Sequence, residues 1–426
     1  MKLSFFRNRE VKNAGWLIAG KVVQMALSLL VGVWTARYLG PGDYGTINYA
    51  NSYVSFFMAF CTLGINSVIV KEFADKSEKI GETLGTAITL RIVSSFLSAL
   101  LIVGIVAIVD FDEPMTIIVT VLCSISLLFH VLDTFNYWFQ YHYKSSITAI
   151  ATLVAYVATA AYRIILLATG KSLLWFALAM SVDYMVLGLV LYIAYKGQNG
   201  PRLSFSWSTG KNILKTSYHY ILSGMMVAIY LQTDKMMLKQ MLGETSVGYY
   251  TVGTTVCGLW AFVLAAIIDA VYPTIIRLHK QSKEAFEKKN RQLYAIVFYL
   301  SVVVSLGFLL LGDQIILFMY GEEYRASCSV LRIATWYTGF SYLGVARSAW
   351  IVCENRQKHL KYLSLGAAIT NVVLNALLIP VWGASGAAVA SLAAQVSTSL
   401  VLPMLMKPLR PNAKLMLEAI ILRKLR

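Results

Sequence analysis

Six basic residues lie within long apolar stretches of this 426-residue chain. They are Lys21, Arg91, Arg163, Lys235, Arg332 and Arg347. At the centre of a bilayer each such charge costs about 2.5–3.5 kcal/mol, so these side chains are expected to face protein or water. Fixed positive charges at several depths are what an anionic group needs to cross a low-dielectric interior. Four of them are our candidate substrate-binding residues: Lys21, Arg91, Arg163 and Lys235.

A structural role is the alternative for the same side chains. Each one either extends from near a helix end to the membrane surface or pairs with an acidic residue of the apolar stretches. Those acidic residues are Asp133, Asp183, Asp234 and Asp269. Adjacent residues of a helix point about 100° apart, so Asp234 and Lys235 cannot simply neutralise each other. Asp183 and Asp234 are also candidates for binding a coupling ion.

A stripe of amides and hydroxyls on one predicted helix is largely repeated 203 residues later. Its members are Asn48, Asn51, Ser52 and Ser55, and the repeat places Thr251, Thr254, Thr255 and Gly258 at the same spacing. The spacing i, i+3, i+4, i+7 puts each set on one helix face. Such groups suit the hydroxyls of a sugar, so Asn48, Asn51 and Thr251 are candidate substrate contacts. Hydrogen bonding between helices explains the stripe equally well.

The elements that carry these residues are predicted to be transmembrane helices. The chain is 58% apolar and only 14% charged, with a mean hydropathy of +0.65, whereas soluble domains have about 25% charged residues. Apolar runs of about 20 residues recur, which is the length of a membrane-spanning helix and not of a barrel strand. The predicted fold is an all-α integral membrane protein with twelve transmembrane helices. They cover residues 14–38, 44–70, 83–109, 115–139, 146–168, 173–195, 214–238, 247–273, 292–312, 326–352, 359–379 and 384–406.

Lysine and arginine are distributed unevenly between alternate loops. One side of the predicted membrane carries 27 of them, and the other side carries 4. Since positively charged loops stay in the cytoplasm, both termini are predicted to be cytoplasmic. The same bias accounts for the net charge of +16, so we expect membrane lipid as a partner and no nucleic acid.

Two short glycine-containing segments are copies of each other. Gly40 and Gly45 in LGPGDYG match Gly243 and Gly248 in LGETSVG at an offset of 203 residues. Both segments follow the first helix of a six-helix half on the outer side, which predicts two parallel lobes related by an axis along the membrane normal. The predicted domains are an N-terminal lobe (1–195), a cytoplasmic linker (196–213), a C-terminal lobe (214–406) and a basic cytoplasmic tail (407–426).

The sequence contains no pattern typical of an enzyme or a metalloprotein. It has no P-loop GxxxxGK[ST] motif, its five histidines are scattered without ligand spacing, and its five cysteines form no CxxC pair. The predicted connections on the outer side are short, so none can carry a catalytic constellation. We therefore expect a protein that is not an enzyme and that uses no cofactor or metal.

Five segments together resemble the Wzx-like polysaccharide flippases of the multidrug/oligosaccharidyl-lipid/polysaccharide exporter superfamily. They are ARYLGPGDYG (36–45), YWFQYHYK (137–144), LQTDKMMLKQMLGETSVGYY (231–250), YGEEYRAS (320–327) and the segment 371–391. The resemblance implies two six-helix lobes around a central cavity that opens alternately to each side of the bacterial cytoplasmic membrane. It implies a polyprenyl-diphosphate-linked oligosaccharide as substrate, moved to the outer leaflet for surface polysaccharide synthesis. It also implies that helices one, two, seven and eight line the cavity, with Lys21, Asn48, Asn51, Lys235 and Thr251 near the substrate.

A polysaccharide polymerase is a candidate partner, and the coupling ion is either a proton or sodium. An ion-coupled multidrug or cation exporter of the same superfamily is the alternative function. Such exporters are expected to use acidic residues in the first lobe, whereas the first predicted helix carries Lys21 and no acid. Away from the ends of the predicted spans, six basic residues against four acidic ones favour an anionic substrate. Asp183, near the middle of the sixth predicted helix, keeps the cation exporter open.

Overall fold

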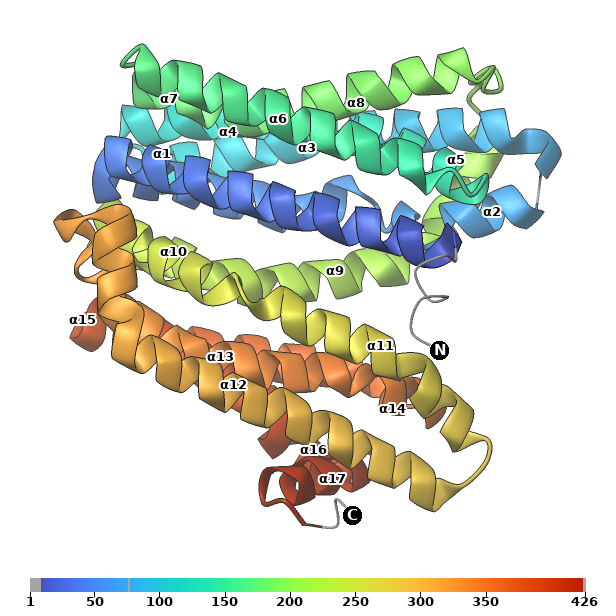
Figure 1. Ribbon diagram of the computed structural model, residues 1–426. Helices are drawn as coiled ribbons and strands as arrows, with labels where there is room; N and C mark the ends of the chain where they lie inside the picture. The colour runs from blue at the N-terminus through green and yellow to red at the C-terminus, as the bar shows by residue number, and fades with distance from the viewer. Residues whose placement is uncertain (1–8, 76, 424–426) are drawn as a thin grey trace. The chain divides into compact units, whose positions relative to one another are not determined.

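The computed structural model describes residues 9–75 and 77–423, apart from the side chains of residues 9–23, 26, 67 and 223. Every regular element in these ranges is a helix (Figure 1). The helices are long, and most are joined by short connections. The predicted all-α fold is therefore confirmed.

Seven helical stretches of the described chain are long and apolar enough to cross a membrane. They are Ser77–Val109, Pro114–Tyr141, Ser145–Ala168, Leu173–Gly197, Ala261–His279, Lys283–Tyr320 and Gln357–Leu405. The protein is thus a multi-pass membrane protein. The count of twelve spans stays a prediction.

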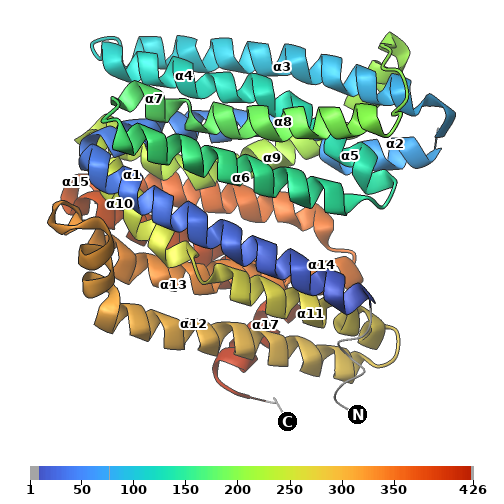
Figure 2. The same cartoon turned by 45° about the horizontal axis from the view of Figure 1, so that its top comes forward.

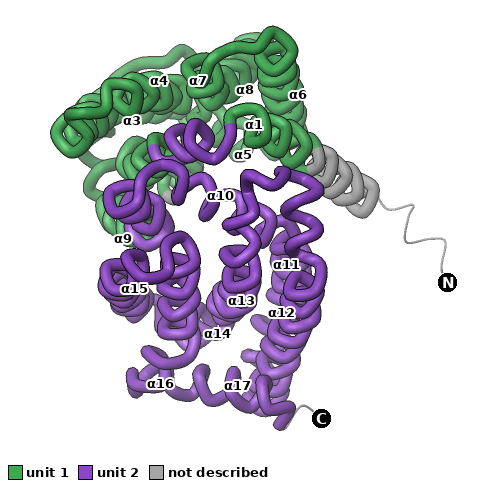
Figure 3. Tube along the Cα trace, turned by 90° about the vertical axis from the view of Figure 1, so that its left-hand side faces the viewer, with its two compact units in different colours: residues 1–39, 50–228 green, residues 40–49, 229–426 purple. Residues whose placement is uncertain are grey.

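Two compact units divide the chain (Figure 3). The first comprises residues 1–39 and 50–228, and the second comprises residues 40–49 and 229–426. The segment expected to be a linker (196–213) falls within the first unit and is hydrogen-bonded to it, and the two six-helix lobes stay a prediction. The backbone N–H of Ser204 donates to the Gly81 carbonyl over 3.3 Å, and that of Ser206 donates to Thr86 Oγ1 over 3.0 Å.

The first unit is a bundle in which α3 packs against α4 and α6 packs against α8 (Figure 2). Its helices are α1 (Arg9–Cys61) without residues 40–49, α2 (Ile69–Asp75), α3 (Ile80–Val109), α4 (Pro114–His130), α5 (Phe135–Tyr141), α6 (Ser145–Ala168), α7 (Leu173–Ala177), α8 (Ala179–Gly197) and the start of α9 (Trp207–Leu242). Pro114 begins α4, where its missing N–H removes no helical hydrogen bond. The core includes Phe73, Leu84 and Phe139, which are fully buried.

The second unit is built around α13, which packs against α10, α12 and α15. Beyond the end of α9, its helices are α10 (Glu244–Gly258), α11 (Ala261–His279), α12 (Lys283–Tyr320), α13 (Ser327–Ala346), α14 (Ser348–Cys353), α15 (Leu360–Val396), a π-helical turn (Ser397–Val401), α16 (Leu402–Leu405) and α17 (Arg410–Ile420). Leu264, Tyr294 and Leu343 are fully buried in its core.

The segment predicted as a basic tail, 407–426, contains α17, which packs along α12 (Figure 1). Met416 of α17 is fully buried. Asn412 is also buried, and its Nδ2 donates to the hydroxyl of Tyr294 over 2.7 Å. The described part of this segment is therefore a component of the second unit's core.

Candidate functional site

The two repeated glycine segments have the same backbone conformation. Gly40 has φ 70° and ψ 171°, and Gly243, 203 residues later, has φ 86° and ψ 175°. Residues other than glycine rarely adopt these positive φ values. Glycine at both positions therefore lets the chain turn sharply between two helical segments. The sequence repeat is thus also a repeat of structure.

The two copies also pack against each other within the second unit. Gly45 lies against the backbone carbonyl of Glu244, and Gly248 lies against the backbone of Pro41. Each glycine leaves no room for a Cβ atom, so the close approach is reciprocal. This packing holds the repeated segments in register.

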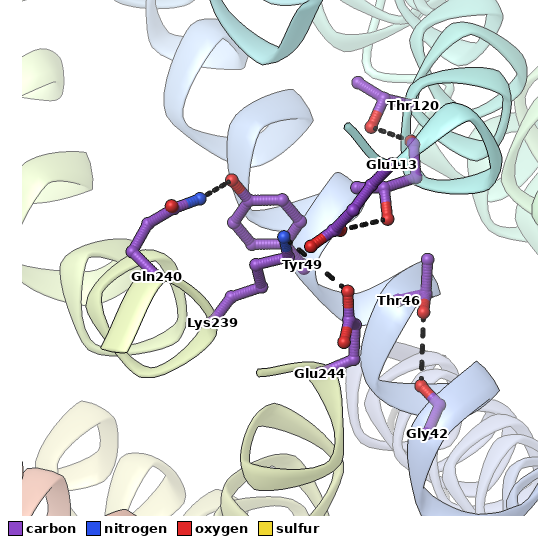
Figure 4. A network of polar contacts seen from close by, with 9 residues as sticks. Gly42, Thr46, Tyr49, Glu113, Thr120, Lys239, Gln240 and Glu244 are labelled. Carbon is purple, nitrogen blue, oxygen red and sulfur yellow. Dashed lines mark hydrogen bonds and ion pairs between the residues drawn. The ribbon is translucent and has the colours of Figure 1, made fainter. Parts of the chain in front are cut away.

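A polar network surrounds this crossing, as Figure 4 shows. Lys239 Nζ lies 3.6 Å from Glu244 Oε1 and 5.5 Å from the centre of the Tyr49 ring. Gln240 Nε2 donates to the Tyr49 hydroxyl over 2.8 Å. The span predicted over 214–238 ends too early, because α9 continues to Leu242, and Lys239 within it is only 5% exposed.

Asp234 is the centre of a buried cluster formed by α9, α10 and α15. Its carboxylate is 3% exposed and accepts hydrogen bonds from the hydroxyls of Tyr250 and Ser391. It also accepts from Asn371 Nδ2 over 2.8 Å and from Asn375 Nδ2 over 2.6 Å. The sequence singled out Asp234 but did not link it to its four donors. The spacing of Asn371 and Asn375, one helical turn apart, was a signal for two of them.

The donors to Asp234 are all neutral, so they stabilise its charge without cancelling it. The carbonyl oxygen Oδ1 of Asn375 is buried and has no hydrogen-bond partner. That of Asn371 accepts from Asn375 Nδ2 over 3.1 Å. A carboxylate beside amide and hydroxyl oxygens is the ligand type that a hard cation prefers, and a carboxylate can also take up a proton. The cluster is chemically able to hold either ion.

The predicted basic residues are distributed over both units. The side chain of Lys21 lies outside the described residues, and Arg163 and Lys235 are half-buried. Arg91 has no exposed surface, and its guanidinium donates to Thr134 Oγ1 over 2.8 Å and to the His130 carbonyl over 3.2 Å. These bonds join α3 to the end of α4, which supports the structural alternative for Arg91.

The polar stripe also divides between the two units. Asn48 Nδ2 donates to the Tyr44 carbonyl of its own helix over 2.8 Å, which is a local use of the side chain. Asn51 Oδ1 and Thr251 Oγ1 are buried and have no hydrogen-bond partner. Asn51 and Thr251 therefore remain the stronger candidates of the stripe.

The other candidate for ion coupling lies in the first unit. Asp183 on α8 accepts a hydrogen bond from Thr159 Oγ1 of α6 over 3.2 Å. Asp183 is half-buried, unlike Asp234. The structure thus places the two candidate carboxylates in different units and gives only Asp234 a shell of four donors.

Comparison with known proteins gives matches over most of the chain. A family model described as polysaccharide biosynthesis protein matches residues 11–279. The capsular polysaccharide biosynthesis protein CapF of Staphylococcus aureus is 22% identical over 389 residues, which are 89% of this chain and 94% of that protein.

Solved structures show the same fold. The lipid II flippase MurJ in an inward closed conformation has a TM-score of 0.72 at 15% identity, over 95% of this chain and 91% of that chain. An inward-facing multidrug resistance MATE family transporter of the MOP superfamily has a TM-score of 0.63 at 16% identity, over 92% of this chain and 96% of that one. At these identities the likeness shows the fold alone, and this fold agrees with the one that the resemblance implied.

Proposed function

Because this chain belongs to the polysaccharide biosynthesis protein family, we propose that it is a flippase for a polyprenyl-diphosphate-linked oligosaccharide. It moves this substrate from the cytoplasmic to the outer leaflet of the bacterial cytoplasmic membrane. The family match over residues 11–279 carries the proposal. The name of the relative CapF, a capsular polysaccharide biosynthesis protein, and the fold shared with a lipid II flippase support it.

The proposed mechanism is alternating access of two lobes of six helices each. Two of the helices are interrupted by glycines with positive φ, α1 at Gly40 and α15 at Gly383. Each of these two helices counts as two spans. Consecutive helices separated by a short break count as one span: α4 with α5, α7 with α8, α10 with α11, and α13 with α14. Together with α3, α6, α9 and α12 they supply twelve, which supports the predicted number of spans. The equal conformations of Gly40 and Gly243 support a parallel repeat.

The basic residues of the spans are proposed to replace the hydration of the diphosphate as it crosses. Arg163 and Lys235 are the described candidates that keep part of their surface accessible, and Lys21 stays a candidate from the sequence. Asn51 and Thr251 are proposed sugar contacts, since each has a buried oxygen without a partner.

The Asp234 cluster is proposed to couple transport to a cation. Its carboxylate accepts hydrogen bonds from α10 and from both segments of α15, so binding of a proton or sodium changes how these helices hold together. Uptake of a cation changes the charge of this buried cluster, which gives the empty and occupied states different stabilities. Asp183 is the second candidate for this role.

A cation exporter is the second candidate function, because a multidrug resistance transporter shares the fold. We expect a polyprenyl-diphosphate oligosaccharide to stabilise the purified protein in liposomes against heat, and simpler polyprenyl diphosphates to do so more weakly. A ligand at 100 times its dissociation constant stabilises the folded state by about 2.7 kcal/mol. Cationic dyes should have little effect, since fixed positive charges repel them.

The measurement is the melting temperature at fixed, moderate ionic strength, because salt screens attraction to the protein surface more than contacts inside a cavity. Stabilisation by the dyes and not by the diphosphate lipids would replace the flippase with the cation exporter.

The proposed orientation is tested by labelling single cysteines in a cysteine-free background. Lys283 and Lys171 are both exposed in the structure, and the distribution of charge places them on opposite sides of the membrane. With a membrane-impermeant thiol reagent on intact cells, Lys171→Cys should be labelled and Lys283→Cys should not. Permeabilised cells, in which both sites react, are the control. Labelling at 283 in intact cells would reverse the orientation.

A further inference from the structure

A cavity of about 200 Å³ lies within the second unit, about one helical turn from the Asp234 cluster and sharing no residue with it. Its polar lining comes from α9, α13 and its C-cap Arg347, α15 and the π-helical turn: Tyr230, Ser341, Arg347, Ser364, Gln395 and Thr398. Ligand pockets for larger organic molecules measure about 300–1,000 Å³, so this cavity suits a small polar group and not an oligosaccharide.

Arg347 is the charged group of this cavity, and it is 5% exposed. Its Nη1 donates to the Thr398 carbonyl of the π-helical turn over 2.8 Å, whereas its Nε is buried without an acceptor. Among the described residues it forms no ion pair, in contrast to Arg291, which pairs with Glu418 at 2.9 Å. A buried guanidinium with a single neutral acceptor is strongly destabilising unless an anion joins it.

The rest of the lining favours a phosphate as that anion. Guanidinium groups bind phosphate oxygens through two parallel N–H donors, and hydroxyl and amide groups supply further donors. Ser341, Ser364 and Gln395 place such groups around the same space as Arg347. Leu360 and Ser364 belong to the first two turns of α15, and the start of a helix attracts negative charge.

The apolar part of the lining points to a lipid as the carrier of the phosphate. Val345 and Leu360 line the cavity and are 45% and 41% exposed, so apolar surface continues outward from it. Lys358 and Lys361 are close to Leu360 in the sequence, and both are exposed. Basic residues next to an apolar surface attract anionic lipid head groups.

We propose that this cavity binds the phosphate group of an anionic phospholipid, with Arg347 as its counter-charge. The bound head group joins α13, α15 and the π-helical turn, and its acyl chains lie along the apolar surface at Val345 and Leu360. This site goes beyond the proposed flippase function and does not depend on the transported substrate.

The test compares phospholipid bound to the detergent-purified wild-type protein and to Arg347→Gln, measured by native mass spectrometry. Lys283→Gln is the matched control, because it removes an exposed positive charge that does not line the cavity. We expect the wild type and Lys283→Gln to retain a phospholipid, and Arg347→Gln to retain at least tenfold less. Equal retention by Arg347→Gln would overturn the proposal.

The source of the phosphate is tested by adding ligands to delipidated protein and measuring the melting temperature. Phosphatidylglycerol should raise it for the wild type and not for Arg347→Gln, and diacylglycerol, which lacks the phosphate, should raise it for neither. Inorganic phosphate is compared with chloride at equal ionic strength. Stabilisation of the wild type by inorganic phosphate alone would keep the phosphate site but overturn the lipid as its source.

A second variant keeps the test decisive if Arg347→Gln does not fold. Ser364→Leu fills the cavity and leaves the charge in place. If a head group occupies the space, the variant should lose the phospholipid and melt at a lower temperature than the wild type. If the cavity is only a gap in packing, filling it should raise the melting temperature with lipid retention unchanged, which would also overturn the proposal.

Discussion

Replacement of Asp234 by asparagine is expected to abolish polysaccharide export and to remove the dependence of the protein's stability on the coupling ion. The carboxylate accepts four hydrogen bonds, from Tyr250, Ser391, Asn371 and Asn375. Asparagine has nearly the same shape but no charge, so the cluster loses the group that would attract a proton or sodium. Export is the first readout, and the melting temperature in sodium, in potassium and at several pH values is the second.

Asparagine is a sharper test at this position than alanine. Alanine would leave four buried donors without an acceptor, and each unsatisfied group costs about 1–3 kcal/mol, so misfolding would obscure the result. Asparagine keeps one oxygen for these donors. The double variant Asp234→Asn/Asn371→Asp returns a carboxylate to the cluster, because the two side chains are hydrogen-bonded at 2.8 Å. It should recover part of the ion dependence.

Asp183→Asn is the matched control, since Asp183 is the other candidate carboxylate and also accepts a side-chain hydrogen bond within a helical bundle. We expect it to retain the ion dependence. If Asp183→Asn removes the dependence and Asp234→Asn keeps it, coupling takes place in the first unit. If Asp234 has only a structural role, Asp234→Asn should lower the melting temperature by the same amount in sodium and in potassium.

The cluster shows what the sequence could predict of a buried site. An acidic residue in an apolar stretch is conspicuous because it is costly there, so Asp234 was found without a structure. Its partners are ordinary polar residues on segments 16 to 157 residues away along the chain. Which helices contact α9 depends on tertiary packing, and helical periodicity within one segment does not reveal it. The hydrogen-bond donors to Asp234 lie on two such helices, α10 and α15, and the sequence did not connect them to it.

Arg91 and Lys239 show the same limit for charged residues. Position along a helix indicates how deep a charge lies but not which neighbour it faces. Arg91, a candidate for the substrate, donates to Thr134 and the end of α4 instead. Lys239 lies just outside the predicted span, which ends at residue 238, because the apolar run ends before it. Its ring contact with Tyr49 and its ion pair with Glu244 allow the helix to continue.

The glycine repeat was predictable in more detail, because its backbone requirement is local. A positive φ and the absence of a Cβ atom are properties of glycine itself, and they fix its position in both copies. The function of the second glycine of each copy depends on the partner copy. Gly45 contacts the Glu244 backbone, and Gly248 contacts the Pro41 backbone. The sequence marked these glycines as repeated, and their mutual contact required the structure.

Gly248→Ala is therefore expected to lower the yield and melting temperature of the protein strongly. The added methyl group would overlap the backbone of Pro41, which cannot rotate away as a side chain can. Overpacking of this kind typically costs about 1–3 kcal/mol. Gly258→Ala on the same helix is the control: nothing lies within 4 Å of its added methyl group, and alanine favours a helix over glycine by about 1 kcal/mol. Fluorescence-detected thermal unfolding compares the two variants. Because the contact is reciprocal, Gly45→Ala should resemble Gly248→Ala. Equal stability of Gly248→Ala and Gly258→Ala would show that the repeated segments do not approach each other as closely as this geometry requires.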